Sequence, residues 1–183
     1  MTIYFTSDTH FGHANIIKLS KRPFSSVEEM DEALISNWNE VVSGEDVVYH
    51  LGDFAYRAGK PIEHYCEQLN GEIRLVIGNH DDPSLRERSD LFSKVSDIEE
   101  ITVEKRKKVV LCHYPMREWP GAWRGAWHLF GHVHSKLDHN PYGFSLDVGV
   151  DSHEYRPIGL ERIREIMSER VNPFDDRTDI SRF

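Results

Sequence analysis

The first half of the chain alternates between short β-prone apolar runs and segments whose apolar residues recur at helical spacing. Steps of three and four from Val27 to Val41 predict an amphipathic helix, and Ser26 stands three residues before Glu29, as in a capping box. A second helix is predicted to begin after Pro61. Predicted strands of this half span residues 3–5, 46–51 and 73–77. This β-α-β-α-β order is typical of stacked α/β layers.

The second half is richer in strands. Residues 101–104 and 107–112 flank a basic turn and predict a hairpin, and further strands are expected around 128–130 and 144–148. Apolar residues from Leu160 onward recur at helical spacing and predict a last helix. The second half is therefore predicted to add more β-structure than helix.

The length of 183 residues fits one domain with a core of its own. The sequence has no repeat, low-complexity tract or linker-like stretch, so residues 1–170 are predicted to form a single domain. Residues 171–183 are polar with few apolar anchors, and they are predicted to form a C-terminal tail.

Five separate segments end a predicted strand with side chains of the kinds that bind metal ions. They are Asp8-x-His10, Gly52-Asp53, Gly78-Asn79-His80-Asp81, His113 and Gly131-His132-Val133-His134. Because the carboxyl ends of strands line the ligand crevice in stacked α/β sheets, all five can converge on one point. Mixed nitrogen and oxygen donors suit Mn, Fe, Ni, Co or Zn better than Ca or Mg. Two carboxylates, one amide oxygen and four imidazoles of this set make seven candidate ligands. Seven ligands suit two ions about 3.5–4 Å apart, if one carboxylate bridges them.

The ordered motifs SDTH, GDF, GNHD, CHYP and FGHVH resemble those of the calcineurin-like metallophosphoesterase superfamily. The resemblance covers about residues 1–150, and SDTHFGHANII followed by RPF is similar to the small bacterial and phage phosphoesterases of that superfamily. It implies a four-layer α/β/β/α sandwich of two mixed sheets, with two metals at the rim of the sheets.

The resemblance also implies which side chains hold each metal. One ion is expected on Asp8, His10, Asp53 and His134, and the second on Asp53, Asn79, His113 and His132. Asp53 would then be the bridge. Two divalent transition-metal ions are expected, with manganese favoured. Two cations lower the pKa of a shared water, so the expected nucleophile is a metal-bridging hydroxide.

His80 matches the family histidine that binds no metal and faces the substrate phosphate. Such a histidine can stabilise charge and protonate the leaving oxygen. Relatives that read GDxxDRG steady this histidine with a second aspartate, but the corresponding residue here is Tyr56. Either Asp81 or Asp82 takes the orienting role, or the histidine–aspartate pair is missing.

Other residues near the motifs have two interpretations each. Arg57 matches a family arginine that touches phosphate, and the alternative is a surface ion pair. His13 is expected either to face the substrate or to stabilise its loop. Trp119, Trp123 and Trp127 belong to a loop between two ligand segments. They are expected either to stack on a nucleobase or to form a small core.

The net charge and the absence of targeting signals limit the partners and the location that we expect for the protein. The 22 Lys and Arg residues against 31 Asp and Glu residues give a net charge of −9, which repels a polyanion unless bound metal inverts the local sign. The sequence has neither a signal peptide nor an apolar run of the roughly 20 residues that a membrane helix needs. We therefore expect a cytoplasmic protein that does not bind a membrane, with Cys66 and Cys112 as small buried residues.

The sequence thus predicts a dinuclear metal-dependent phosphoesterase that acts on a phosphate ester, with phosphodiesters or nucleotides favoured and a nucleotide or short nucleic acid as a candidate partner. A phosphomonoesterase, including a phosphoprotein phosphatase, is the alternative within enzymes, because the same metals serve both reactions. A non-catalytic metal-binding scaffold is the alternative from another class. Every expected ligand position and His80 are intact in the sequence, which favours an enzyme.

Overall fold

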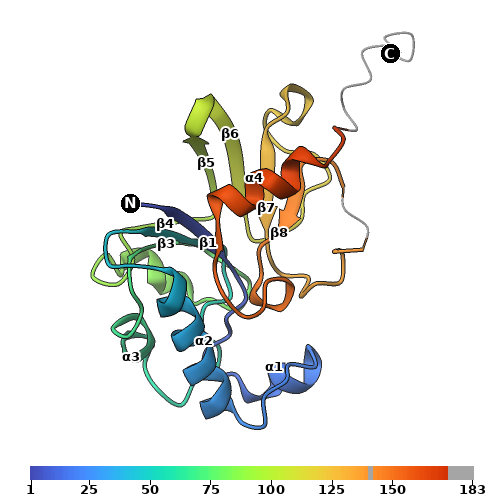
Figure 1. Cartoon of the computed structure of the whole chain (residues 1–183). Coiled ribbons are helices and arrows are strands. Elements are labelled where there is room, and N and C mark those ends of the chain that lie inside the picture. Colours follow the sequence, from blue (N-terminus) through green and yellow to red (C-terminus); the bar gives the residue numbers. More distant parts are fainter. Residues whose placement is uncertain (140–141, 173–183) are drawn as a thin grey trace.

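Two β-sheets pack face to face in the computed structural model, which describes residues 1–139 and 142–172 (Figure 1). Residues 173–183 of the predicted tail lie outside the described residues. None of the helices in the described part of the chain is both long enough and apolar enough to cross a membrane.

The first sheet has five strands in the order β4-β3-β2-β1-β9. Four of them run parallel, and β9 pairs antiparallel with β1. The strands are β1 (Ile3–Thr6), β2 (Val47–His50), β3 (Glu72–Val76), β4 (Lys94–Ser96) and β9 (Ile158–Gly159). The strands expected at 3–5, 46–51 and 73–77 are confirmed, while β4 and β9 escaped prediction.

The second sheet has four strands in the order β5-β6-β7-β8. The predicted hairpin is confirmed as the antiparallel pair β5–β6, whereas β6, β7 and β8 run parallel. The strands are β5 (Ile98–Val103), β6 (Lys107–Cys112), β7 (Trp127–Phe130) and β8 (Ser145–Asp147). Each sheet therefore mixes parallel and antiparallel pairs, as the sequence predicts.

Within the described residues, four α-helices accompany the sheets: α1 (Ala14–Leu19), α2 (Val27–Val41), α3 (Ile62–Cys66) and α4 (Leu160–Ser168). The predicted start of α2 is confirmed, because Ser26 Oγ accepts a hydrogen bond from the Glu29 amide at 3.1 Å. Short 3₁₀ helices are η1 (Pro83–Glu87), η2 (Glu104–Arg106), η3 (Ala122–Arg124) and η4 (Val150–Ser152). Sequence periodicity missed α1, which is only six residues long.

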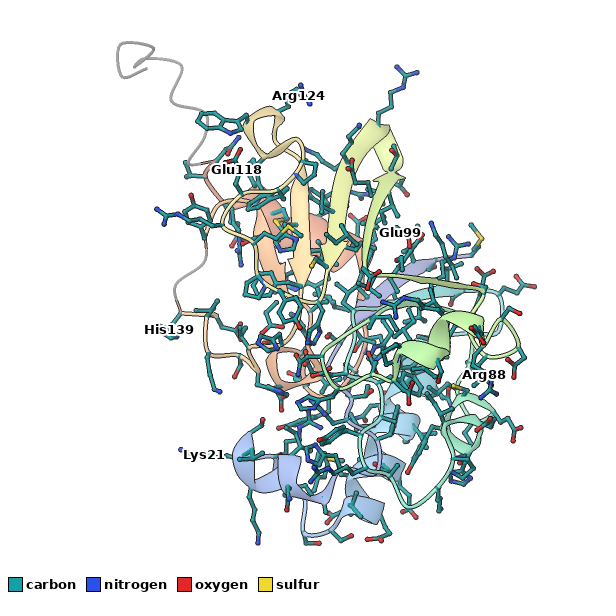
Figure 2. All side chains as sticks on the ribbon, turned by 180° about the vertical axis from the view of Figure 1, so that it is seen from behind. Lys21, Arg88, Glu99, Glu118, Arg124 and His139 are labelled. Carbon is teal, nitrogen blue, oxygen red and sulfur yellow. The ribbon has the colours of Figure 1, made fainter. Side chains whose placement is uncertain are left out.

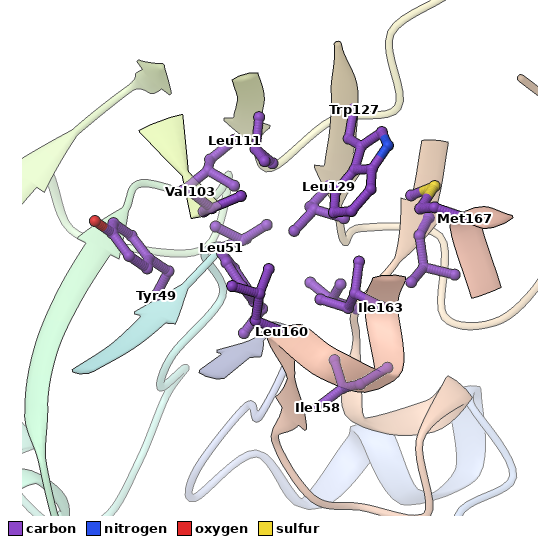
Figure 3. Close-up of a cluster of buried hydrophobic side chains, with 14 of the residues drawn as sticks. Tyr49, Leu51, Val103, Leu111, Trp127, Leu129, Ile158, Leu160, Ile163 and Met167 are labelled. Carbon is purple, nitrogen blue, oxygen red and sulfur yellow. The ribbon is translucent and has the colours of Figure 1, made fainter. Parts of the chain in front are cut away.

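The first sheet is buried on both faces, and β2 shows why. Val47 and Tyr49 point into a core shared with the second sheet, and Val48 points into a core shared with α1, α2 and α3. Figure 3 shows the first core, into which α4 inserts Ile163 and Met167 beside side chains of both sheets. Helices α1–α3 lie on the side of the first sheet away from the second sheet (Figure 1). The two-sheet α/β sandwich expected from the sequence is confirmed.

Two of the three tryptophans that were predicted to lie in one loop are buried, and Trp127 belongs to β7 instead. Trp119 is 3% exposed and packs with Val110 on the other face of the second sheet, and Trp127 is buried between the sheets. Trp123 is 55% exposed, and its indole donates a hydrogen bond to Glu118 at 2.9 Å. Of the two interpretations, a small core is therefore correct for Trp119, and neither it nor Trp127 is available to a nucleobase.

Candidate metal centre

The predicted ligand side chains meet where five strands end. Asp8 and His10 follow β1, Asp53 follows β2, and Asn79 follows β3, three parallel strands whose carboxyl ends share one edge of the first sheet. From the second sheet, His113 follows β6, while His132 and His134 follow β7. The parallel pairing in each sheet brings these segments to one place.

The backbone at these strand ends is turned into an unusual conformation. Five of the seven predicted ligands have a left-handed backbone, which costs about 1–3 kcal/mol at a non-glycine residue and is concentrated at functional sites. Their φ angles are 58° at Asp8, 51° at His10, 57° at Asp53, 71° at His132 and 49° at His134. The positive φ angles show that the chain leaves the extended strand conformation at these residues, which lie in the turns that follow the strands.

Glycines beside the ligands make this close approach feasible. Gly52 itself adopts a left-handed backbone with φ of 96°. A Cβ on Gly78 would collide with Asp53 Oδ1, and one on Gly131 would collide with Ser7 Oγ and Asp8 Oδ2. The left-handed backbone thus favours glycine at position 52. The carboxylates of Asp53 and Asp8 pack so closely that glycine is required at positions 78 and 131.

One group of ligand atoms combines Asp8, His10 and His134. The Asp8 Oδ1 atom lies 4.0 Å from His10 Nε2 and 3.9 Å from His134 Nε2. Asp8 and His10 are buried, yet Asp8 Oδ1 and His10 Nε2 have no hydrogen-bond partner. Buried polar atoms are rarely left without partners, and a shared cation would satisfy both of them.

A second group combines Asp53, His113 and His132. His113 Nδ1 donates to the Leu51 carbonyl at 2.7 Å, which leaves the Nε2 lone pair directed at the centre. That Nε2 atom lies 3.1 Å from the amide oxygen of Asn79. Two imidazoles, a carboxylate and an amide oxygen therefore surround one point, a donor set that suits a divalent transition metal.

Asp53 lies between the two groups. Its Oδ2 atom is 3.4 Å from His10 Nε2 in the first group and 3.5 Å from His113 Nε2 in the second. Its other oxygen, Oδ1, accepts a hydrogen bond from the His80 amide at 2.9 Å. One carboxylate oxygen is thus anchored to the backbone, and the other faces ligand atoms of both groups.

Burial sets the charge state of these groups in the absence of a cation. Desolvation raises the pKa of Asp8 to about 7 and also raises the pKa of Asp53. Desolvation lowers the pKa of His10, and it lowers that of His113 to about 4, so both imidazoles are neutral and available as ligands. The buried carboxylates therefore favour a bound positive charge.

The raised pKa of Asp8 predicts a pH-dependent stability of the metal-free protein. A carboxyl group whose pKa is higher in the folded state than in the unfolded state stabilises the fold at a pH below its unfolded-state pKa. This contribution is lost as the pH rises through the folded-state pKa, which is about 7 for Asp8. The loss is on the order of 4 kcal/mol. In EDTA, Asp8→Asn should gain stability relative to the natural protein between pH 5 and pH 8, as measured by thermal unfolding. An unchanged stability difference across that range would contradict the assignment.

Arg22 and Asp151 support the first group, and sequence reasoning missed both. Arg22 is 4% exposed, and its guanidinium holds both oxygens of Asp151 at 2.9 Å. Arg22 also donates to the carbonyls of Asp8 at 2.6 Å and Thr9 at 2.9 Å, while Asp151 accepts from His134 Nδ1 at 2.7 Å. One buried arginine thus fixes the backbone of one ligand segment and the imidazole of another.

This arrangement raises the basicity of His134. Burial by itself lowers the pKa of His134, but the hydrogen bond to Asp151 and the charges of Asp8 and Asp151 outweigh it, so the net shift is upward. A carboxylate behind a ligating histidine orients the ring and strengthens it as a donor. The only sequence signal was the arginine of the RPF motif, which carried no role by itself.

We predict that Arg22→Lys weakens metal binding at the first group by about 10–100-fold, because lysine keeps the charge but loses the paired hydrogen bonds to Asp151. Calorimetric titration of the metal-free protein with Mn²⁺ measures this. Arg162→Lys is the matched control, since Arg162 is exposed on α4 and forms an ion pair with Glu165. Equal affinities for the two variants would show that Arg22 has no positioning role.

Neither Asp81 nor Asp82 forms a hydrogen bond with the His80 ring in the described part of the chain, so of the two alternatives the missing histidine–aspartate pair applies. Asp81 is buried and accepts hydrogen bonds from the amides of Gly78, Asp53 and Phe54 at 2.8–2.9 Å, which fixes the Asp53 segment. Asp82 instead accepts from the Ser84 amide at the start of η1. The aspartate next to His80 in sequence therefore holds the backbone of the Asp53 segment in place.

His80 is positioned by ring packing. Its imidazole lies 4.3 Å from the Tyr56 ring and 5.4 Å from His10, measured between ring centroids. His13 is buried, with its ring 5.2 Å from His10 and 4.9 Å from Tyr56. Arg57 is exposed, and its guanidinium lies 5.1 Å from the centre of the Tyr56 ring. Tyr56 therefore lies against both histidines.

Comparison with known proteins agrees with the fold. The chain matches the calcineurin-like phosphoesterase superfamily domain over residues 1–143. It is 38% identical over 174 residues to an uncharacterized protein of Methanocaldococcus jannaschii, covering 91% of this chain and 92% of that protein. It is 29% identical to the gene 66 protein of Mycobacterium phage D29, covering 91% and 96% of the two chains.

Among solved structures, a protein of unknown function from Aquifex aeolicus superposes with a TM-score of 0.72 at 29% identity, covering 90% of this chain and 98% of that one. The chain belongs to the calcineurin-like phosphoesterase superfamily. Membership implies divalent metal ions and a phosphate-ester substrate.

Proposed function

We propose that this protein is a dinuclear metal-dependent phosphoesterase that acts on phosphodiesters or nucleotides. The observation that carries the proposal is the position of Asp53 Oδ2, at nearly equal distances from His10 and His113 of the two ligand groups. A carboxylate between two groups of imidazole ligands is the donor arrangement that two adjacent cations need.

Each ion has four protein ligands in this proposal, and Asp53 is common to both. The first is held by Asp8, His10, Asp53 and His134, and the second by Asp53, Asn79, His113 and His132. Manganese is the favoured metal, with iron, nickel, cobalt or zinc as alternatives, because the donors mix imidazoles with carboxylate and amide oxygens. When bound, two such ions neutralise phosphate charge and acidify water.

The chain's own residues complete the reaction. His80 donates a proton to the leaving oxygen, because its ring lies beside the ligand groups and its backbone is tied to Asp53 Oδ1. Arg57 and His13 are proposed to contact the substrate, and the side chains of both residues lie against the Tyr56 ring. Tyr56 packing, rather than an aspartate, holds His80 in position.

An accessible centre favours diesters over one tightly enclosed metabolite. Asn79 and His132 are exposed although both face the second group. A phosphomonoesterase, including a phosphoprotein phosphatase, would use the same ligands. We also propose a cytoplasmic location, since Cys66 and Cys112 are both free thiols.

Two measurements test the function. Metal content per chain and hydrolysis of bis-p-nitrophenyl phosphate against p-nitrophenyl phosphate are compared after loading with Mn²⁺. About two ions per chain and faster diester turnover support the proposal. Faster monoester turnover would establish the phosphomonoesterase alternative, and neither metal nor turnover would leave a non-catalytic scaffold.

A further inference from the structure

A cavity of about 470 Å³ opens beside His80, outside the two ligand groups. It is lined by the segments 55–62 and 80–88, which contribute the cationic side chains of Arg57, Lys60 and Arg88 and one carboxylate, that of Asp82, which accepts a hydrogen bond from the Ser84 amide. Its remaining lining includes apolar side chains such as Ile62 and Leu85. Arg88 is labelled in Figure 2. Cationic side chains outnumber carboxylates in this lining, although the chain has a net charge of −9.

The cations of this cavity differ in how far they are already neutralised. Arg88 forms ion pairs of 2.7 Å with Glu63 and with Asp90. Arg57 and Lys60 have no carboxylate within ion-pair distance among residues 1–139 and 142–172, and the Lys60 ammonium lies 3.1 Å from His64 Nε2. Two positive charges of the lining therefore remain available to an anion.

Arg57 is fixed relative to the proposed catalytic histidine. Its guanidinium lies over the Tyr56 ring at 5.1 Å, and that ring contacts His80 at 4.3 Å. Arg57 also has a left-handed backbone with φ of 49°, a conformation that a non-glycine residue keeps only when its surroundings impose it. The stacked order of Arg57, Tyr56 and His80 places the cationic cavity directly next to the reaction centre.

We propose that Arg57 and Lys60 bind a second phosphate of the substrate, one that is not hydrolysed. The inference rests on the proposed function, which assigns the reacting phosphate to the ligand groups and His80. The preferred substrate is then a phosphate ester that bears another phosphate, as in a nucleoside bisphosphate. The apolar part of the lining accommodates the carbon skeleton between the two phosphates.

Affinity measured by calorimetry on the Mn²⁺-loaded protein tests this separately from turnover. Thymidine 3′,5′-bisphosphate should bind about tenfold more tightly than thymidine 5′-monophosphate, as expected for charge-assisted hydrogen bonds at a partly exposed site. The double variant Arg57→Gln, Lys60→Gln should bind the two ligands with nearly equal affinity. The control Lys108→Gln, Arg162→Gln changes the net charge equally at exposed positions and should keep the preference.

Three results would overturn the proposal: no preference in the natural protein, a preference that survives in the cavity variant, or an equal loss in the control. Absence of binding by both ligands would also overturn it. A protein that prefers the bisphosphate but hydrolyses no phosphate ester would support the cavity assignment and contradict the phosphoesterase proposal. The two failures are therefore distinguishable.

Discussion

Asp53→Asn is expected to lose at least one metal ion per chain and essentially all phosphoesterase activity. Asparagine can still accept the His80 amide through Oδ1, so the backbone anchor is retained. The change replaces the oxygen that lies 3.4–3.5 Å from His10 and His113 with an amide nitrogen that has no lone pair to offer. Two dications would then lie close together without their shared anion.

Metal content by elemental analysis and turnover of bis-p-nitrophenyl phosphate measure this effect. Asp97→Asn is the matched control, because Asp97 is exposed and its carboxylate forms a surface ion pair with Arg86. The control should keep both ions and nearly full activity. An Asp53→Asn protein with two ions per chain and near-normal turnover would refute the bridging role.

His80→Ala is expected to keep both metal ions and the fold while kcat falls by about 10²–10⁴-fold, the usual contribution of a general acid. Alanine keeps the amide that binds Asp53 and removes only the imidazole. The loss should depend on the leaving group. A p-nitrophenolate departs readily without a proton, whereas a nucleoside alkoxide does not, so alkyl diesters should lose more activity than aryl diesters.

The comparison of leaving groups also separates proton transfer from packing. His80→Asn keeps a hydrogen-bond donor without a titrating proton, and its activity should fall between the natural protein and His80→Ala. His139→Ala, at an exposed position, is the control for loss of a histidine. If His80 only packs against Tyr56, aryl and alkyl substrates would decline together and thermal stability would fall.

The elements that the sequence predicts well are those with a long or regular pattern. The α2 helix shows its apolar face over four turns and begins at a serine cap, and both features are local in the chain. In contrast, β4 has three residues and β9 has two, so neither is long enough to show an alternation. They are strands because the neighbours β3 and β1 supply hydrogen-bond partners.

The candidate ligands could be predicted because their signal is also local. Each follows a strand and stands in a short motif, and parallel pairing brings the ends of such strands together whatever the details of packing. The three tryptophans gave no such signal. Trp119 and Trp127 are equally spaced around Trp123 in the sequence. Trp119 and Trp127 are nevertheless buried on opposite faces of the second sheet, whereas Trp123 is exposed.

The sequence by itself determined the α/β class, the main strands and helices, and the set of side chains offered to metal ions. Only the tertiary structure decided what holds those side chains. Arg22 reaches Asp151 across 129 residues of chain, and Asp81 reaches the Asp53 amide across 28. The physical reason is that ligand chemistry belongs to individual residue types, whereas a supporting hydrogen bond exists only when folding places donor and acceptor within about 3 Å of each other.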